Sequence, residues 1–97
     1  EVRHVGRRTG AVILTHADGT LAGLFTDSDL ARLFEANEDA AFDRPIAAVM
    51  TRNPVTIGRH AKVGDALSVL KARKISELPV VDADGRPVGM LDITDLI

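Results

Sequence analysis

Apolar residues along the chain gather in short runs, and one arrangement of runs occurs at residues 12–30 and again at residues 78–96. In each copy a β-prone run leads into an Asp-Gly pair, Asp18-Gly19 or Asp84-Gly85, and a second apolar run follows. Two such runs predict a β-hairpin with a type I′ turn, because Asp and Gly tolerate the positive φ that this turn needs. The repetition predicts one pseudo-symmetric domain of two similar halves, with sites where the halves meet.

A helix follows the first hairpin in the predicted order of elements. Leu30, Leu33 and Phe34 fall at positions i, i+3 and i+4, which places them on one face of a helix. This helix is expected to begin at Thr26 and to end near Asn37. The second hairpin leads into a matching helix start at residues 92–96, so the chain stops just inside its last helix.

The second half also shows what precedes its hairpin. Residues 55–57 form a β-prone run, and apolar residues mark one face of a helix over residues 62–74. A short helical turn is predicted at residues 46–50. The complete unit is therefore strand, helix, strand, strand, helix. We expect the first half to be truncated at its N-terminus, where only a helix tail at residues 1–8 remains of the first two elements.

These patterns predict a mixed α/β (α+β) fold made of two tandem repeats about a pseudo-two-fold axis. The first repeat is expected at residues 1–37 and the second at residues 48–97. A polar, acidic linker at residues 38–47 joins them.

Composition narrows the classes of function. The chain has 97 residues and no cysteine, which excludes a disulfide scaffold and a thiolate zinc site. The net charge of −2 argues against broad nucleic-acid binding, which needs a basic face. No apolar stretch is long enough to cross a bilayer. Since no phosphate loop, catalytic triad order or metal-ligand spacing occurs, we expect no catalytic residue and no metal site in this chain.

Candidate chemistry begins with Thr26 and Asp29, which lie three residues apart where a helix is predicted to start. A hydroxyl and a carboxylate beside the free N–H groups of a helix suit a phosphate and the hydroxyls of a ribose. The same two residues also suit a capping box, in which they bind the helix's own N–H groups. The residues alone leave both interpretations open.

The second copy of this motif differs in one respect. Asp92 replaces the threonine, so two carboxylates, Asp92 and Asp95, lie at the helix start. Two like charges ~4 Å apart repel by about 4 kcal/mol at an effective dielectric constant of 20, and this repulsion opposes a phosphate. We therefore predict two unequal clefts, with any nucleotide in the cleft that contains Asp29.

Residues 49–57, residues 75–82 and the paired D-G-x-x-x-G-x-x-T/D-x-x-D-L blocks resemble a tandem CBS domain pair, a module named for cystathionine β-synthase. The resemblance implies a regulatory module that binds an adenine nucleotide (AMP, ADP or ATP), or failing that a nucleotide-sugar, between its repeats. It implies that Asp29 binds the ribose and that Thr26 lies near the phosphate. It assigns the rest of the ligand-binding site to Leu24, Ser28, Thr51, Val55, Ile75 and Ser76.

Residues 6–10, 23–30 and 50–54 are similar to the C-terminal half of bacterial arabinose-5-phosphate isomerases. In those enzymes a sugar isomerase domain precedes the CBS pair. The alternative is a CBS pair that belongs to another host enzyme or to a transporter. The resemblance thus implies a cytoplasmic host that acts on a sugar phosphate in lipopolysaccharide biosynthesis.

Three functions remain open at this point. The chain is a nucleotide-sensing regulatory module, a purely structural module that holds an oligomer together, or an independent enzyme, for which it lacks catalytic groups. CBS pairs commonly associate through their helices, and a shortened first half leaves Leu30, Leu33, Phe34 and Val63 poorly covered. We therefore expect a homodimer with helix 28–36 near the interface.

Overall fold

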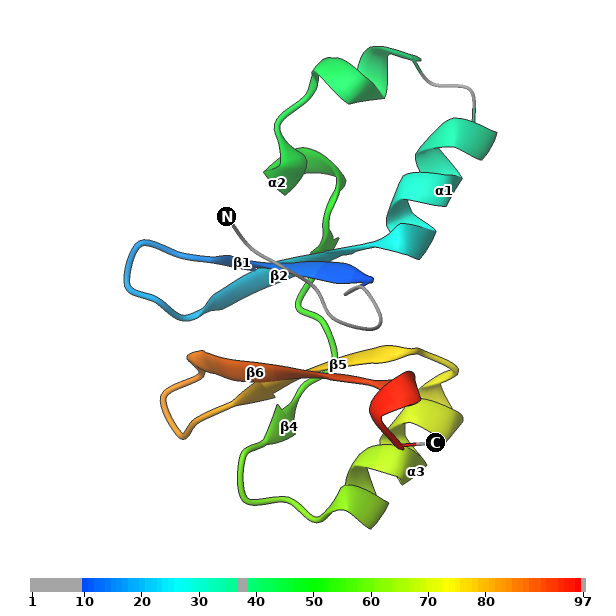
Figure 1. Ribbon diagram of the computed structural model, residues 1–97. Helices are drawn as coiled ribbons and strands as arrows, with labels where there is room; N and C mark the ends of the chain where they lie inside the picture. Colours follow the sequence, from blue (N-terminus) through cyan, green and yellow to red (C-terminus); the bar gives the residue numbers. More distant parts are fainter. Residues whose placement is uncertain (1–9, 37–38, 97) are drawn as a thin grey trace, which may run out of the picture.

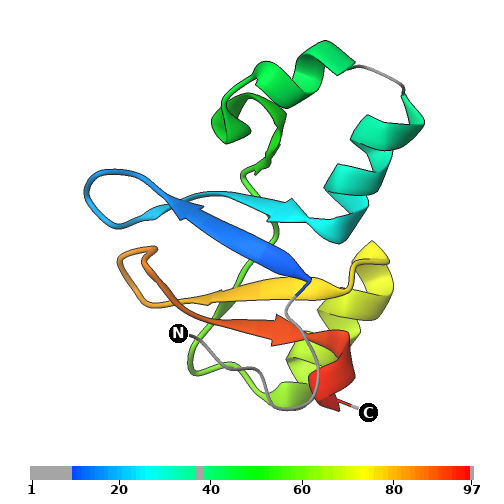
Figure 2. The ribbon, with the colours of Figure 1, turned by 45° about the horizontal axis from the view of Figure 1, so that its top comes forward.

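The computed structural model describes residues 10–36 and 39–96, which form two three-stranded sheets with strand orders β1-β2-β3 and β4-β5-β6 (Figure 1). The two sheets lie next to each other, with α1 and α2 beyond the first sheet and α3 beyond the second (Figures 1 and 2). This mixed architecture of two similar halves confirms the predicted fold class. The elements in chain order are β1 (Ala11–Thr15), β2 (Leu21–Thr26), α1 (Asp27–Glu35), the 3₁₀ helix η1 (Asp39–Asp43), α2 (Ile46–Val49), β3 (Thr51–Arg52), β4 (Ile57–Gly58), α3 (Val63–Arg73), β5 (Glu77–Val81), β6 (Pro87–Asp92) and the 3₁₀ helix η2 (Ile93–Leu96).

Both predicted hairpins are present, and they match in detail. β1 pairs antiparallel with β2, and β5 pairs antiparallel with β6. Each pairing shifts its register near the turn, between Leu14 and Thr15 in the first hairpin and between Val80 and Val81 in the second. The register shift therefore recurs at the equivalent place in both hairpins.

The predicted type I′ turn is wrong at both hairpins. Gly19 has a φ of +89°, but in the described ranges the only residues other than glycine with positive φ are Asn53 and Lys74, so Asp18 and Asp84 keep negative φ. The first loop has three residues, because the N–H of His16 donates to the carbonyl of Thr20 at 2.8 Å. A three-residue loop needs positive φ only at its last position, which the glycine occupies.

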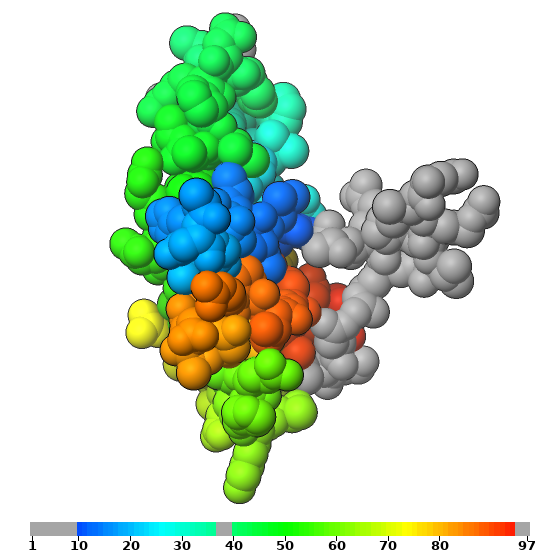
Figure 3. Space-filling view, turned by 90° about the vertical axis from the view of Figure 1, so that its left-hand side faces the viewer, coloured from blue at the N-terminus to red at the C-terminus, as the bar shows by residue number. Residues whose placement is uncertain are grey.

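The two turns also join the halves. The N–H of Leu21 donates to the carbonyl of Gly85 at 3.0 Å, and Nε of Arg86 donates to the carbonyl of Asp18 at 3.3 Å. The space-filling view shows the two turns in contact (Figure 3). The halves therefore meet along their hairpins, as expected for paired repeats.

α3 covers the second sheet and forms the main core with it. Ala66 and Leu70 of α3 pack against Leu78 of β5, and all three are buried. The helix ends where Lys74 adopts a φ of +55° and the N–H of Ile75 donates to the carbonyl of Leu70 at 3.1 Å. This Schellman-type end turns the chain sharply into β5.

The first half is less well covered. Val12 occupies the position in β1 that Leu78 occupies in β5, yet Val12 is 57% exposed and Leu78 is fully buried. In the described part of the chain, no helix precedes β1 as α3 precedes β5. The helix tail predicted at residues 1–8 lies outside the described residues.

Four features of the middle and end of the chain differ from expectation. The strand predicted at residues 55–57 pairs only at its end, as β4, because Ile57 and Gly58 alone lie beside Val80 and Val81. The segment predicted as a linker contains η1, whose Ala41 is buried. β3 was not predicted, and it pairs with β2 of the first half. The last helix is of the 3₁₀ type over its described residues.

None of the helices in the described ranges is long and apolar enough to cross a membrane.

Candidate functional site

A cleft of about 360 Å³ lies between the two halves, and every ligand-binding residue expected from the sequence lines it. The first half contributes the end of β2 and the start of α1. The second half contributes the residues after β3 and the loop between α3 and β5 (Figure 2). The predicted residues that line the cleft are Leu24, Thr26, Ser28, Asp29, Thr51, Val55, Ile75 and Ser76.

Five further residues line the cleft and were missed by sequence reasoning: Arg32, Asn53, Pro54, Lys74 and Glu77. The position of each of these residues in the sequence indicated that it lies near the site. Arg32 follows Asp29 by three residues on the same helix, which makes them neighbours on its surface. Pro54, Lys74 and Glu77 each adjoin a predicted site residue in the sequence, and Asn53 lies midway between the predicted residues Thr51 and Val55.

Thr26 and Asp29 form a capping box at the start of α1, as one of the two interpretations predicted. The hydroxyl of Thr26 accepts a hydrogen bond from the N–H of Asp29 at 3.1 Å. Oδ2 of Asp29 accepts a hydrogen bond from the N–H of Thr26 at 2.8 Å. The first turn of α1 is thereby fixed, so that these two side chains face the cleft in a defined geometry.

Asp29 is a charged side chain that is almost completely buried, with 5% of its surface exposed. Besides its role in the capping box, it accepts hydrogen bonds from the hydroxyl of Thr51, at 3.1 Å to Oδ1 and 3.3 Å to Oδ2. Its Oδ1 also forms an ion pair with Arg32. A buried carboxylate is stable only with such partners, and those of Asp29 come from both α1 and β3.

The position of Thr51 depends on the unpredicted strand β3. Thr51 pairs with Leu24 of β2, which brings it to the strand end from which α1 begins. Gly23 allows this close approach, because a Cβ atom at that position would lie 2.8 Å from the carbonyl oxygen of Thr51. The contact between Asp29 and Thr51 therefore rests on a glycine in β2.

The remaining wall of the cleft is apolar. Leu24 is buried, whereas Val55 and Ile75 are half-buried and also pack against the core beneath α3. Their fixed positions provide an apolar surface beside the polar groups of α1. Clefts that bind small molecules commonly combine an apolar wall with a few placed polar groups.

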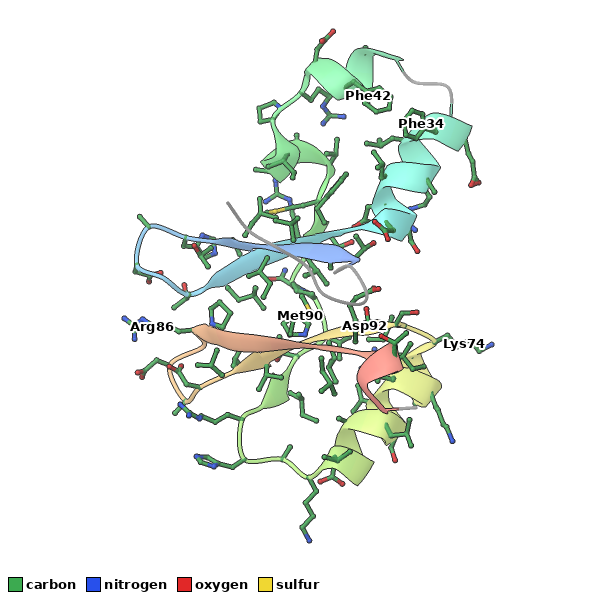
Figure 4. All side chains as sticks on the ribbon, viewed as in Figure 1. Phe34, Phe42, Lys74, Arg86, Met90 and Asp92 are labelled. Carbon is green, nitrogen blue, oxygen red and sulfur yellow. The ribbon has the colours of Figure 1, made fainter. Side chains whose placement is uncertain are left out.

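Charges of both signs surround the cleft. Arg32 lies on the α1 side, and Lys74 extends outward from the loop after α3 (Figure 4). Glu77 lies on the second half, where burial and then the negative charges of Asp92, Asp27 and Asp29 raise its pKa. Arg32 is paired with Asp29, whereas Glu77 lies among other carboxylates, so the charges around the cleft are mixed.

Backbone strain is also concentrated at this cleft. Asn53 and Lys74 have φ values of +49° and +55°, and within the described ranges they alone among residues other than glycine have positive φ. Both line the cleft. Left-handed conformations of such residues are uncommon and tend to occur at functional sites.

Asp92, where the second motif differs from the first, binds the residue two positions further along the chain. Its Oδ1 accepts hydrogen bonds from the N–H of Thr94 at 2.9 Å and from the hydroxyl of Thr94 at 2.8 Å. Asp92 lies at the end of β6 (Figure 4), where its charge contributes to the raised pKa of Glu77. The prediction of two unequal clefts stays a prediction.

Within the residues that the structure describes, no group of three or more carboxylate, imidazole or thiol side chains is placed to hold a metal ion.

Comparison with known proteins identifies the family. The family model described as "CBS domain" matches residues 46–97, which is more than half of the chain. The chain belongs to the CBS domain family.

Curated relatives match the CBS region of longer proteins. Arabinose 5-phosphate isomerase KdsD of Pseudomonas aeruginosa is 39% identical over 88 residues, which are 91% of this chain and 27% of the isomerase. The CBS domain-containing protein CBSCBSPB5 of Arabidopsis thaliana is 34% identical over 91 residues, which are 94% of this chain and 16% of the plant protein. The chain thus spans about a quarter or less of the length of these relatives.

Solved structures of CBS proteins share the fold and carry adenosine ligands. The CBS domain pair of protein MJ0100, in complex with 5′-methylthioadenosine and S-adenosyl-L-methionine, has a TM-score of 0.78 and 28% identity, over 90% of this chain and 66% of that one. CBS domain protein PAE2072 of Pyrobaculum aerophilum, complexed with AMP, has a TM-score of 0.80 and 26% identity over the same shares. These neighbours show that this chain has the fold of a CBS domain pair.

Proposed function

We propose that this CBS domain pair is a regulatory module that binds an adenine nucleotide in the cleft between its halves. The observation that carries the proposal is that one cleft collects all eight residues to which the sequence assigned ligand binding. Two CBS structures with 28% and 26% identity to this chain bind adenosine compounds, which supports the same class of ligand here.

The geometry of the cleft favours one orientation of the nucleotide. Asp29 accepts hydrogen bonds from the ribose hydroxyls, because a carboxylate is an acceptor for two neighbouring O–H groups. The phosphate lies near Thr26 and Ser28, at the N-terminal end of α1. The adenine ring rests against the apolar wall of Leu24, Val55 and Ile75, with Thr51 and Ser76 at its polar edge.

The host in this proposal is a sugar-phosphate isomerase of the arabinose-5-phosphate isomerase type, located in the cytoplasm and serving lipopolysaccharide biosynthesis. The identity of 39% to KdsD of Pseudomonas aeruginosa supports this host. The similarity to the Arabidopsis protein shows that related CBS regions also occur in other proteins. Binding of the nucleotide would then control an isomerase domain in the same chain.

Isothermal titration calorimetry with AMP tests the ligand directly. Titration of AMP into the parent protein should release or absorb heat with a stoichiometry of one AMP per chain. Asp29→Ala should abolish this signal. Asp95→Ala, at the corresponding position of the second motif, is the matched control and should leave binding nearly intact. Absence of heat from AMP, ADP and ATP, or equal loss in both variants, would refute nucleotide sensing.

A structural role in dimerisation is the second candidate, and the exposed apolar residues favour it. Leu30, Phe34 and Val63 are 38%, 65% and 67% exposed. Phe34 of α1 also packs against Phe42 of η1, with ring centroids 5.1 Å apart (Figure 4). Exposed apolar faces of this kind are usually buried against a partner, and we propose a second copy of this chain.

Light scattering measures the mass of the protein in solution and therefore tests whether the chain forms a dimer. The parent protein should have the mass of a dimer, and Phe34→Glu should shift it to a monomer without changing its circular dichroism. Val12→Glu, an exposed apolar position on β1 rather than α1, should leave the mass unchanged. A monomeric parent protein at high concentration would refute dimerisation.

A further inference from the structure

Most of the hydrogen-bonding capacity of Asp29 is already used in this structure. Its two oxygens accept from the N–H of Thr26, from the hydroxyl of Thr51 and from the guanidinium of Arg32. A carboxylate has about four acceptor positions, so these three donors leave about one free. If the proposed function holds and both hydroxyls of a ribose bind here, one of the three donors must leave.

The three donors differ in how firmly they are held. The N–H of Thr26 belongs to the main chain at the start of α1, and it cannot leave without unwinding the helix. Thr51 is held in β3 by its pairing with Leu24. The side chain of Arg32 is 66% exposed, so water can replace its ion pair at little cost. Arg32 is therefore the donor that a ribose displaces.

A displaced Arg32 stays within the same cleft, because it lines the cleft on the α1 side. Its guanidinium carries five N–H donors in a planar fork, and this fork matches the oxygens of a phosphate. Lys74 extends outward from the loop after α3 (Figure 4). Glu77 lies beside Asp27 at the start of α1, because a Cβ atom at Gly10 would lie 3.3 Å from Oε2 of Glu77 and 3.2 Å from Oδ2 of Asp27. Of the two cations that line the cleft, Arg32 is the one on the helix that begins beside Thr26.

We propose that Arg32 is a specificity-determining residue, which exchanges Asp29 for the 5′-phosphate of the bound nucleotide. This inference rests on the proposed function and names the ligand class within it. One of the two related structures contains AMP, and the other contains S-adenosyl-L-methionine together with 5′-methylthioadenosine, which is uncharged. AMP and 5′-methylthioadenosine must each displace Arg32 from Asp29, but only AMP offers it a new partner. The cleft therefore prefers AMP.

The test measures the affinities of AMP and 5′-methylthioadenosine by calorimetry for four proteins: the parent, Arg32→Ala, Arg32→Lys and Arg44→Ala. Arg32→Ala should lower the affinity for AMP about tenfold, which is the usual effect of losing a charge-assisted hydrogen bond. The same variant should bind 5′-methylthioadenosine at least as tightly as the parent does, since no ion pair has to be broken. Arg32→Lys should recover part of the AMP affinity.

The salt dependence of AMP binding separates phosphate binding by Arg32 from mere support of Asp29, and Arg44→Ala is the control. The AMP affinity of the parent protein should fall as salt is raised, and this dependence should be smaller in Arg32→Ala. Arg44, an exposed arginine outside the cleft lining, should behave like the parent when replaced by alanine. Thermal melting shows whether each variant is folded.

Several outcomes would overturn the inference. If Arg32→Ala loses equal affinity for AMP and for 5′-methylthioadenosine, Arg32 only supports Asp29. Tighter binding of 5′-methylthioadenosine than of AMP by the parent protein would show that the cleft does not select for the phosphate. If the parent binds neither compound, this inference fails, whereas the proposed function fails only if ADP and ATP do not bind either.

Discussion

Replacement of Asp29 by alanine should lower the stability of the fold even without a ligand. The substitution removes the acceptor for the N–H of Thr26 and for the hydroxyl of Thr51. A lost capping interaction costs about 1 kcal/mol, and a backbone N–H left without a partner inside the protein costs about 1–3 kcal/mol. The ion pair with Arg32 adds little, because Arg32 is 66% exposed. We expect a total loss of about 2–3 kcal/mol.

Urea denaturation followed by circular dichroism measures this loss. Asp27→Ala is the matched control, since Asp27 lies in the same first turn of α1 but is exposed. It loses only a favourable interaction with the helix dipole, about 0.3–1 kcal/mol. Equal losses in the two variants would refute the view that Asp29 is a structural centre of this site.

A double-mutant cycle isolates the contact between the two elements that Asp29 joins. Thr51→Val keeps the shape of the side chain and removes its hydroxyl. The free-energy changes of Asp29→Ala and Thr51→Val should be non-additive by roughly 0.5–1.5 kcal/mol, because the two side chains share hydrogen bonds at 3.1 and 3.3 Å. Additive changes would show that the contact between α1 and β3 contributes nothing measurable.

Three further predictions concern the core, the sheet and the acidic side of the cleft. Leu78→Ala should cost about 2–5 kcal/mol in urea denaturation, whereas Val12→Ala should cost less than about 1 kcal/mol, because only Leu78 is buried. Gly23→Ala should cost about 1–3 kcal/mol, since its Cβ would press on β3; an unchanged stability would contradict this. The pKa of Glu77 is raised above its ordinary 4.5, so the folded state is favoured by protonation, and this advantage is lost as pH rises through the raised value. Glu77→Gln should therefore stabilise the protein at pH 7 by up to about 1 kcal/mol, and the gain should vanish below about pH 4.5 when unfolding is measured across pH.

Elements that form from local interactions were predictable. The hairpins β1-β2 and β5-β6 connect neighbouring runs through an Asp-Gly turn, so the turn residues and the apolar pattern suffice. The helices α1 and α3 show apolar periodicity over several turns, and the capping box of α1 lies within four consecutive residues, 26–29. The eight site residues were predictable through the family motif, whose segments lie at the ends of these elements.

Short elements that exist only through distant partners were not predictable. β3 has two residues, too few to show any alternation, and it is a strand only because β2 lies beside it. A strand was predicted at residues 55–57, but the limits of β4 at Ile57 and Gly58 follow from its pairing with β5. The turn type was missed because loop length depends on the register of the strands, which shifts in both hairpins. Local sequence contains no information about such pairings.

For the site, the sequence determined which residues have suitable chemistry, and the tertiary structure decided how they are combined. The sequence placed Thr26 and Asp29 on the first turn of a helix, where a cap and a ligand site are equally consistent. Only the pairing of β3 with β2 brought Thr51 to Asp29, and only the meeting of the halves placed Arg32 and Glu77 around one cleft. The physical reason is that burial and charge at a site depend on residues far apart in the chain, whose contacts follow from the packing of complete elements.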